Sequence, residues 1–87
     1  MQPGQLGILI VEDDPDQRAL MQRHLAQLGY EDISFVTQSD EAIAHAASHH
    51  PDLILMDISL GSGLDGISTA REIYRNKPTP IVYVTSY

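Results

Sequence analysis

The stretch Ile8–Asp14, with the sequence ILIVEDD, is the strongest indication of fold class: four aliphatic residues are followed directly by three carboxylates. A continuous aliphatic run of this length, rich in β-branched residues, is typical of a strand buried on both faces of a parallel sheet. The run Leu53–Met56 is likewise followed by Asp57, and the run Ile81–Val84 is followed by Thr85. Three such strands, each ending in a polar residue, predict an open parallel sheet with a polar edge.

Helix signals separate these runs. Asp14 offers an N-cap oxygen, Pro15 suits the first helical position, and Gly29 is typical of a helix C-terminus. The helix between them is expected to carry an apolar stripe at Leu20, Met21, Leu25 and Leu28. The remaining predicted elements are a strand at 32–37, a helix capped by Ser39 that ends before Pro51, and a helix after the Gly- and Ser-rich loop at 59–66. This β-α-β-α-β-α-β order predicts an α/β fold with right-handed crossovers and helices on both faces of the sheet.

Length and composition limit the classes of protein. The chain has 87 residues, 43% of them apolar, which is enough for one domain; we expect a flexible N-terminal end at 1–6 and a single domain at 7–87. The absence of cysteine excludes a disulfide framework and a thiolate zinc site. A formal net charge of −7 with scattered cations argues against direct nucleic-acid binding. No signal peptide or membrane-length apolar run is evident, so we expect a cytoplasmic protein with no membrane partner.

The acidic residues that follow the strands suggest a metal site. Ligands of open parallel sheets bind outside the carboxyl ends of the strands. If the strands at 8–11 and 53–56 are neighbours, Glu12, Asp13 and Asp57 meet there, and their charges repel unless a cation neutralises them. An oxygen-only ligand set with few protein donors suits Mg²⁺, which often bridges carboxylate to phosphate. The sequence therefore predicts a Mg²⁺ site that receives a phosphoryl group.

Each residue of this predicted site can be given a role. Asp57 is the expected nucleophile, forming an aspartyl phosphate. Asp13 is expected to bind the metal directly, and Glu12 directly or through water. The backbone carbonyl of Ser59 can supply a further oxygen ligand, and the Thr85 hydroxyl can contact a phosphoryl oxygen.

Three stretches together resemble the receiver domain of two-component response regulators: ILIVEDDPDQR at 8–18, LILMDISLGSGLDG at 53–66 and PIVYVTSY at 80–87. The resemblance implies a flavodoxin-like, doubly wound parallel sheet in three layers, with strand order 2-1-3-4-5. It implies that Asp57 is the phosphoacceptor, that Glu12 and Asp13 are the acidic pair, and that Thr85 is a switch hydroxyl. Such a domain takes a phosphoryl group from a sensor histidine kinase or a phosphotransfer protein, with Mg²⁺, and relays the signal to an output domain or protein.

The sequence departs from this family at its C-terminal end. Receivers have a fifth strand that ends in a lysine, whereas this sequence ends at Tyr87, so the expected order is 2-1-3-4 with the fifth βα unit missing. Lys77 precedes the fourth strand and is expected near the opposite edge of the sheet. The strand Ile81–Val84 would then be an exposed apolar edge, which predicts that the 87-residue chain is unstable as a monomer. We expect it to aggregate, to pair edge to edge or exchange elements with a second copy as a homodimer, or to be the ordered part of a longer protein.

Alternative interpretations remain. The chain can be a phosphorylation-independent interaction module, or a Mg²⁺-dependent aspartyl phosphatase, although such phosphatases carry an Asp where this chain has Ser59. As an enzyme, the receiver would at most phosphorylate itself and slowly hydrolyse the product. The acidic pair can also be a helix cap with solvated charge, and Thr85 a plain strand residue.

Histidines and glycines favour structural interpretations. His45 and His49 have the i, i+4 spacing that can bind zinc, but no third ligand is evident, so we interpret them as structural or solvated. The glycines of the loop at 59–66 lack the phosphate-loop pattern, and we attribute them to loop flexibility.

Overall fold

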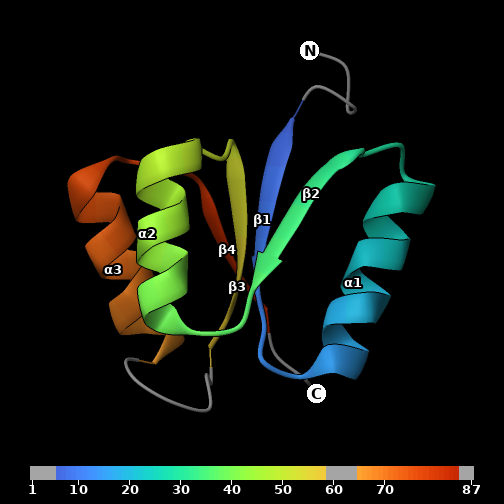
Figure 1. Cartoon of the computed structure of the whole chain (residues 1–87), viewed down its shortest axis with the longest axis horizontal. Helices are drawn as coiled ribbons and strands as arrows, with labels where there is room; N and C mark the ends of the chain where they lie inside the picture. Colours follow the sequence, from blue (N-terminus) through green and yellow to red (C-terminus); the bar gives the residue numbers. More distant parts are fainter. Residues whose placement is uncertain (1–5, 59–64, 85–87) are drawn as a thin grey trace.

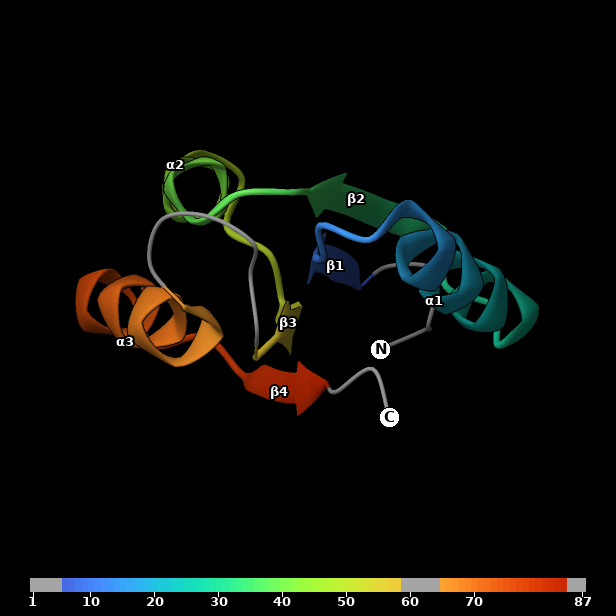
Figure 2. The ribbon, with the colours of Figure 1, turned by 90° about the horizontal axis from the view of Figure 1, so that it is seen from below.

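Four parallel strands form one sheet in the order β2-β1-β3-β4 in the computed structural model, which describes residues 6–58 and 65–84. Helix α1 covers one face of the sheet, and α2 and α3 cover the other (Figures 1 and 2). The three-layer α/β fold and the strand order 2-1-3-4 are thereby confirmed. The elements are β1 (Gly7–Val11), α1 (Pro15–Gln27), β2 (Asp32–Val36), α2 (Ser39–His49), β3 (Leu53–Asp57), α3 (Gly66–Asn76) and β4 (Ile81–Val84).

Strand β1 occupies the centre of the sheet. It pairs with β2 on one side and with β3 on the other, and its residues from Ile8 to Val11 are at most 2% exposed. The strand order changes direction between β1 and β3. Helix α1 connects β1 to β2 on one side, and α2 connects β2 to β3 on the other side of β1. In doubly wound folds this switch point is where ligands bind.

The apolar core lies between the sheet and the two helices on its α2–α3 face. Alanines at the inner face of α2 allow that helix to approach the sheet closely. The residues of this core come from β1, β3, α2 and α3: Leu9, Val11, Ala42, Ala46, Ile54, Met56, Ala70 and Ile73. Full burial of one large aliphatic side chain contributes about 1.5–3 kcal/mol, so this face supplies most of the fold's hydrophobic stabilisation.

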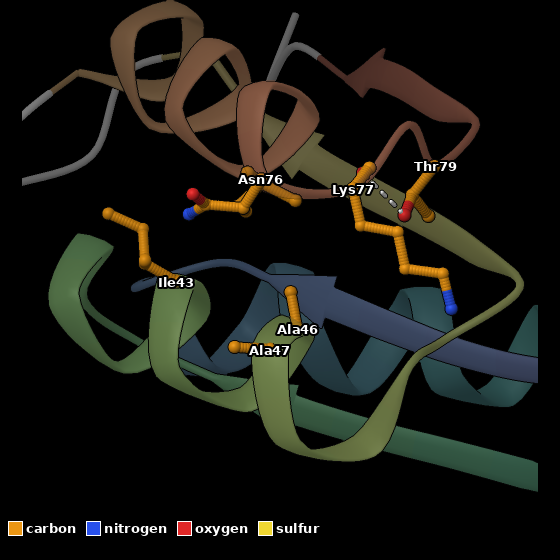
Figure 3. A pocket seen from close by; sticks show the side chains of 7 residues that line it. Ile43, Ala46, Ala47, Asn76, Lys77 and Thr79 are labelled. Atoms are coloured by element: carbon orange, nitrogen blue, oxygen red, sulfur yellow. Dashed lines mark hydrogen bonds between the residues drawn. The ribbon is translucent and has the colours of Figure 1, made fainter.

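A small cavity of about 20 Å³ remains between α2 and α3, near the ends of both helices (Figure 3). Lys77 and Thr79 line it, and the Thr79 hydroxyl donates a hydrogen bond of 3.1 Å to the Lys77 carbonyl. Lys77 thus follows α3 and precedes β4, at the end of the sheet where the strands begin, as predicted. The acidic residues lie at the opposite end, where the strands finish.

Helix α1 begins as predicted but packs differently. The Asp14 carboxylate accepts the Asp16 N–H at 2.9 Å, Pro15 is the first helical residue, and Gly29 follows the helix with a positive φ of 99°. However, α1 buries none of its residues, and two predicted stripe members, Leu20 and Leu28, are 40% and 68% exposed. The apolar stripe prediction was therefore wrong at these two positions, because α1 lies without a neighbouring helix on its face of the described sheet (Figures 1 and 2).

One further detail differs from the sequence-based expectation. Ser39 is the first residue of α2 rather than its N-cap; the cap is Gln38, whose side chain makes no capping hydrogen bond. Ser39 is buried, at 6% exposed, so its side chain points into the protein rather than toward the free N–H groups of a helix end in solvent.

β4 is an outer strand of the described sheet, as expected for the order 2-1-3-4, and Val82 and Tyr83 are nearly half exposed.

None of the helices within residues 6–58 and 65–84 combines the length and apolar character needed to cross a bilayer.

Candidate functional site

The carboxyl ends of β1 and β3 carry the polar residues of the site, and the register of these two strands sets their positions. Val11 pairs with Met56, so the next residue of each strand, Glu12 and Asp57, lies at the same level on neighbouring strands. The Glu12 N–H continues the ladder on the other side by donating to the Val36 carbonyl at 3.1 Å. Strand pairing alone therefore places two carboxylates side by side at the switch point.

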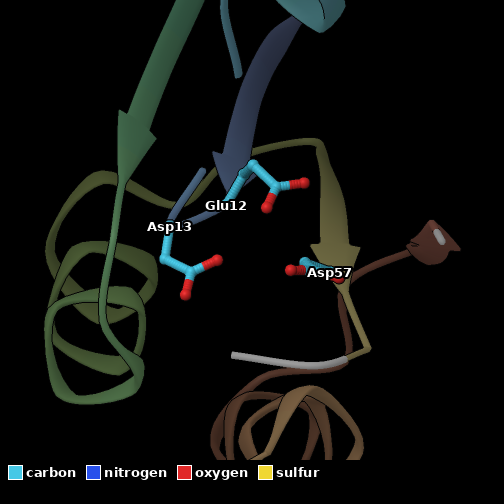
Figure 4. Close-up of side chains that lie close together, drawn as sticks. All are labelled: Glu12, Asp13 and Asp57. Atoms are coloured by element: carbon cyan, nitrogen blue, oxygen red, sulfur yellow. The ribbon is translucent and has the colours of Figure 1, made fainter. Parts of the chain in front are cut away.

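Three carboxylates come together at this position, as the sequence predicted. One oxygen from each of Glu12, Asp13 and Asp57 lies within 4.8 Å of the other two. Glu12 and Asp57 are only 3% and 4% exposed, whereas Asp13 is exposed. The three side chains point into a common space beyond the ends of β1 and β3 (Figure 4). We call these residues the acidic cluster.

The surroundings of the acidic cluster change the pKa of one of its members, Glu12. Burial raises the pKa of Glu12 from 4.5 to about 7, and Asp57 adds to the rise through a hydrogen bond and through its charge. A weak hydrogen bond from the Asp14 N–H, at 3.3 Å to Glu12 Oε2, acts in the opposite direction. At neutral pH and without a counter-cation, Glu12 in the folded state is therefore partly protonated.

The donor set of the acidic cluster fits a hard divalent cation. All three groups offer carboxylate oxygens, and Mg²⁺ prefers oxygen ligands, keeps several waters and needs few protein donors. Exposure of Asp13 leaves one side of the cluster open to solvent, from which water ligands can come. A bound cation would also oppose the rise in the pKa of Glu12, which comes chiefly from burial and then from Asp57.

Arg18 supports the backbone beside the acidic cluster, a contribution that the sequence analysis missed. Its guanidinium stacks on the Phe35 ring at 4.3 Å from the centroid, and its Nη1 donates a 3.4 Å hydrogen bond to the Glu12 carbonyl. It therefore ties α1 to the ends of β1 and β2. The sequence signal was only its place on the first turn of the helix that follows the acidic pair.

Gly66 is the second residue that sequence reasoning misjudged. It is buried as the first residue of α3, and its N–H donates to the Ile58 carbonyl at 2.9 Å. A Cβ at this position would overlap the backbone carbonyl of Asp57. Gly66 thus permits close approach of α3 to the strand end that carries Asp57, and the attribution to loop flexibility was wrong here.

Two predicted site residues, Ser59 and Thr85, lie outside the described residues. Their expected roles stay predictions. The residue before Thr85, Val84, pairs with Asp57, and its carbonyl accepts the Ile58 N–H at 3.3 Å.

Comparisons with known proteins agree with this architecture. A family model for the response regulator receiver domain matches residues 8–87. The chain is 36% identical over 85 residues to the transcriptional regulatory protein ResD of Bacillus subtilis, covering 98% of this chain and 35% of that protein. It is 38% identical over 79 residues to the transcriptional regulatory protein BaeR of Escherichia coli O6:H1, covering 91% of this chain and 32% of that protein.

Solved structures give the same result. The signal receiver domain of a modulated diguanylate cyclase from Desulfovibrio desulfuricans G20 matches with a TM-score of 0.85 and 35% identity, over 93% of this chain and 65% of that one. The chain spans about a third of the length of the two curated relatives above.

Proposed function

The chain belongs to the response regulator receiver family, and we propose that it is a phosphoacceptor module in which Asp57 receives a phosphoryl group. The donor would be a phosphohistidine on a sensor histidine kinase or a phosphotransfer protein. The recipient of the signal would be an output domain or a separate output protein. The observation that carries this proposal is the acidic cluster at the switch point of the sheet.

The transfer itself requires an in-line displacement. A carboxylate oxygen of Asp57 attacks phosphorus, the bond between phosphorus and the histidine nitrogen breaks, and the nitrogen keeps the electron pair. Asp57 ends β3 and is 4% exposed, so its position is fixed by the strand and by the close approach of Gly66. Phosphoryl transfer depends mostly on positioning and charge neutralisation, which suits a site with few catalytic groups.

We further propose that Glu12, Asp13 and Asp57 hold Mg²⁺, with the Ser59 carbonyl as an additional ligand. When bound, Mg²⁺ neutralises negative charge on the carboxylates and on the phosphoryl oxygens. In support, the three carboxylates lie within reach of a single ion, and burial and then Asp57 raise the pKa of Glu12. Thr85, which follows Val84, is proposed to donate its hydroxyl to a phosphoryl oxygen and to act in switching.

Labelling with acetyl phosphate and Mg²⁺, read by intact mass, tests the proposal. We expect the wild-type chain to gain one phosphoryl group and Asp57→Asn to gain none. Asp32→Asn is the matched control. Asp32 also belongs to a strand, but it lies at the start of that strand, away from the carboxyl ends where Asp57 lies. Equal labelling of Asp57→Asn and wild type would refute the assignment of Asp57. No labelling of either would favour a phosphorylation-independent interaction module.

A further inference from the structure

The peptide that joins Glu12 to Asp13 lies where the chain leaves the sheet, and both of these residues belong to the acidic cluster. The Glu12 N–H still pairs with β2, because it donates to the Val36 carbonyl at 3.1 Å. The Glu12 carbonyl accepts a hydrogen bond of 3.4 Å from Arg18 Nη1. Asp13 is exposed and lies beyond the end of β1. The direction of its side chain toward the other two carboxylates therefore depends on how this peptide is held.

Arg18 is itself held by a helix and by a ring of a neighbouring strand. Its backbone N–H donates to the Asp14 carbonyl at 2.9 Å, in the first turn of α1. Its guanidinium carbon lies 4.3 Å from the centroid of the Phe35 ring, on β2. A guanidinium stacked in this way keeps its N–H donors in a fixed planar fork. The half-buried side chain is thus restrained at its Cα and at its charged end.

We propose that Arg18 is a positioning residue: by fixing the peptide between Glu12 and Asp13, it raises the Mg²⁺ affinity of the acidic cluster. The Phe35 ring is the support on which this role depends. The inference rests on the proposed function, since it concerns the same metal site. A guanidinium has only N–H donors and cannot bind a cation, so Arg18 acts through the backbone of Glu12. Groups that orient metal ligands commonly act in this indirect way.

The sign of the effect distinguishes positioning from charge. A guanidinium near a bound cation repels it, so a role through charge alone predicts that Arg18→Gln binds Mg²⁺ more tightly. A positioning role predicts weaker binding, because the peptide is less restrained and Asp13 must be ordered when the ion binds. We expect a loss of about tenfold, the lower end of the range for groups that orient metal ligands. The lower end applies because the bond to the Glu12 carbonyl is long, at 3.4 Å.

The Phe35 ring gives a second test, from a strand that carries none of the three carboxylates of the acidic cluster. Phe35→Leu removes the ring and should weaken Mg²⁺ binding, whereas Phe35→Tyr keeps the ring and should bind like the wild type. The double variant Arg18→Gln with Phe35→Leu should bind no more weakly than Arg18→Gln alone, because the two residues act as one unit. Phe35 is nearly half exposed, so its variants should fold even if Arg18→Gln does not.

The test measures cation binding by the 87-residue chain directly, without a phosphodonor. Mn²⁺, which like Mg²⁺ suits carboxylate and water ligands, is the probe: the electron paramagnetic resonance signal of the free ion falls on binding, and Mg²⁺ then displaces the ion. Arg23→Gln is the matched control, since Arg23 is an exposed arginine of the same helix. Leu25→Ala, at a half-buried position of α1, controls for a general loss of packing. Both controls should bind like the wild type, and far-UV circular dichroism checks that each variant is folded.

Three results would overturn the inference and leave the Mg²⁺ site in place: unchanged or tighter binding in Arg18→Gln, an equal loss in either control, or additive losses in the double variant. Asp13→Ala separates these results from failure of the proposed function. If the wild type binds Mg²⁺ no better than Asp13→Ala does, the acidic cluster is not the metal site. The proposed Mg²⁺-dependent function and the role of Arg18 would then fail together.

Discussion

Replacing Glu12 by Gln should remove a pH dependence that the acidic cluster builds into the stability of the fold. The pKa of Glu12 is raised in the folded state, from 4.5 to about 7, chiefly by burial and then by Asp57. A group whose pKa is raised on folding stabilises the fold fully below its unfolded pKa. That contribution is lost as the pH rises through the folded pKa. In the absence of divalent cations, the stability of the wild type should therefore fall between about pH 4.5 and 7.

The size of the effect follows from the pKa change. A rise from 4.5 to about 7 corresponds to roughly 3 kcal/mol, at 1.36 kcal/mol for each pKa unit. Gln resembles the protonated carboxyl and does not titrate. Glu12→Gln should consequently exceed the wild type's free energy of unfolding by less than about 1 kcal/mol at pH 5 and by up to about 3 kcal/mol at pH 8.

Urea unfolding in chelator, at pH 5 and pH 8, measures the difference between variant and wild type. The comparison with the wild type is needed because His45 has the opposite effect on the pH dependence of stability. Its pKa is lowered on folding, so its contribution to stability is present above pH 6.5 and is lost as the pH falls. Glu31→Gln is the matched control, since Glu31 is an exposed carboxyl before β2. The reasoning would fail if Glu12→Gln and the wild type kept the same stability difference at both pH values. Saturating Mg²⁺ should shrink the gap at pH 8, because the cation stabilises the ionised carboxylates.

Three further predictions concern the metal, the site backbone and the sheet edge. Asp13→Ala should abolish the rise in melting temperature that millimolar Mg²⁺ gives the wild type; an unchanged rise would place the Mg²⁺ site elsewhere. Gly66→Ala should lower the free energy of unfolding, measured in urea, by about 1–3 kcal/mol. Gly7→Ala should cost less, because a Cβ there would contact only side-chain carboxylates, and equal losses would contradict the close approach at Gly66. Val82→Lys, on the edge strand β4, should reduce self-association of the 87-residue chain in light scattering; a monodisperse wild-type monomer would show that this edge needs no cover.

Local signals were sufficient for most of the helices and strands. The apolar runs that became β1, β3 and β4 are continuous and too short for helices, and those of β1 and β4 are rich in β-branched residues. Asp14, Pro15 and Gly29 marked the ends of α1. Such signals act within a few residues of themselves, so they can be read without knowing the fold. Ser39 shows their limit, because this expected N-cap is a buried first residue of α2.

The acidic cluster could be predicted only in part. The sequence showed that Glu12, Asp13 and Asp57 follow strands, but their meeting required β1 and β3 to be neighbours, which came from resemblance to a family. The structure adds the register, the burial and the raised pKa of Glu12. Arg18 and Gly66 were missed as parts of the site because their roles depend on groups far along the chain.

Hydrophobic periodicity and capping are local properties, so the α/β alternation, the buried strands and the residue types available for chemistry could be predicted from the chain alone. The fold was needed to bring distant groups together: Glu12 with Asp57 at the carboxyl ends of the strands, and His45 near Asp32 at the amino ends. Strand order and register set these distances. They result from packing of the whole core, in which no single segment specifies its neighbour.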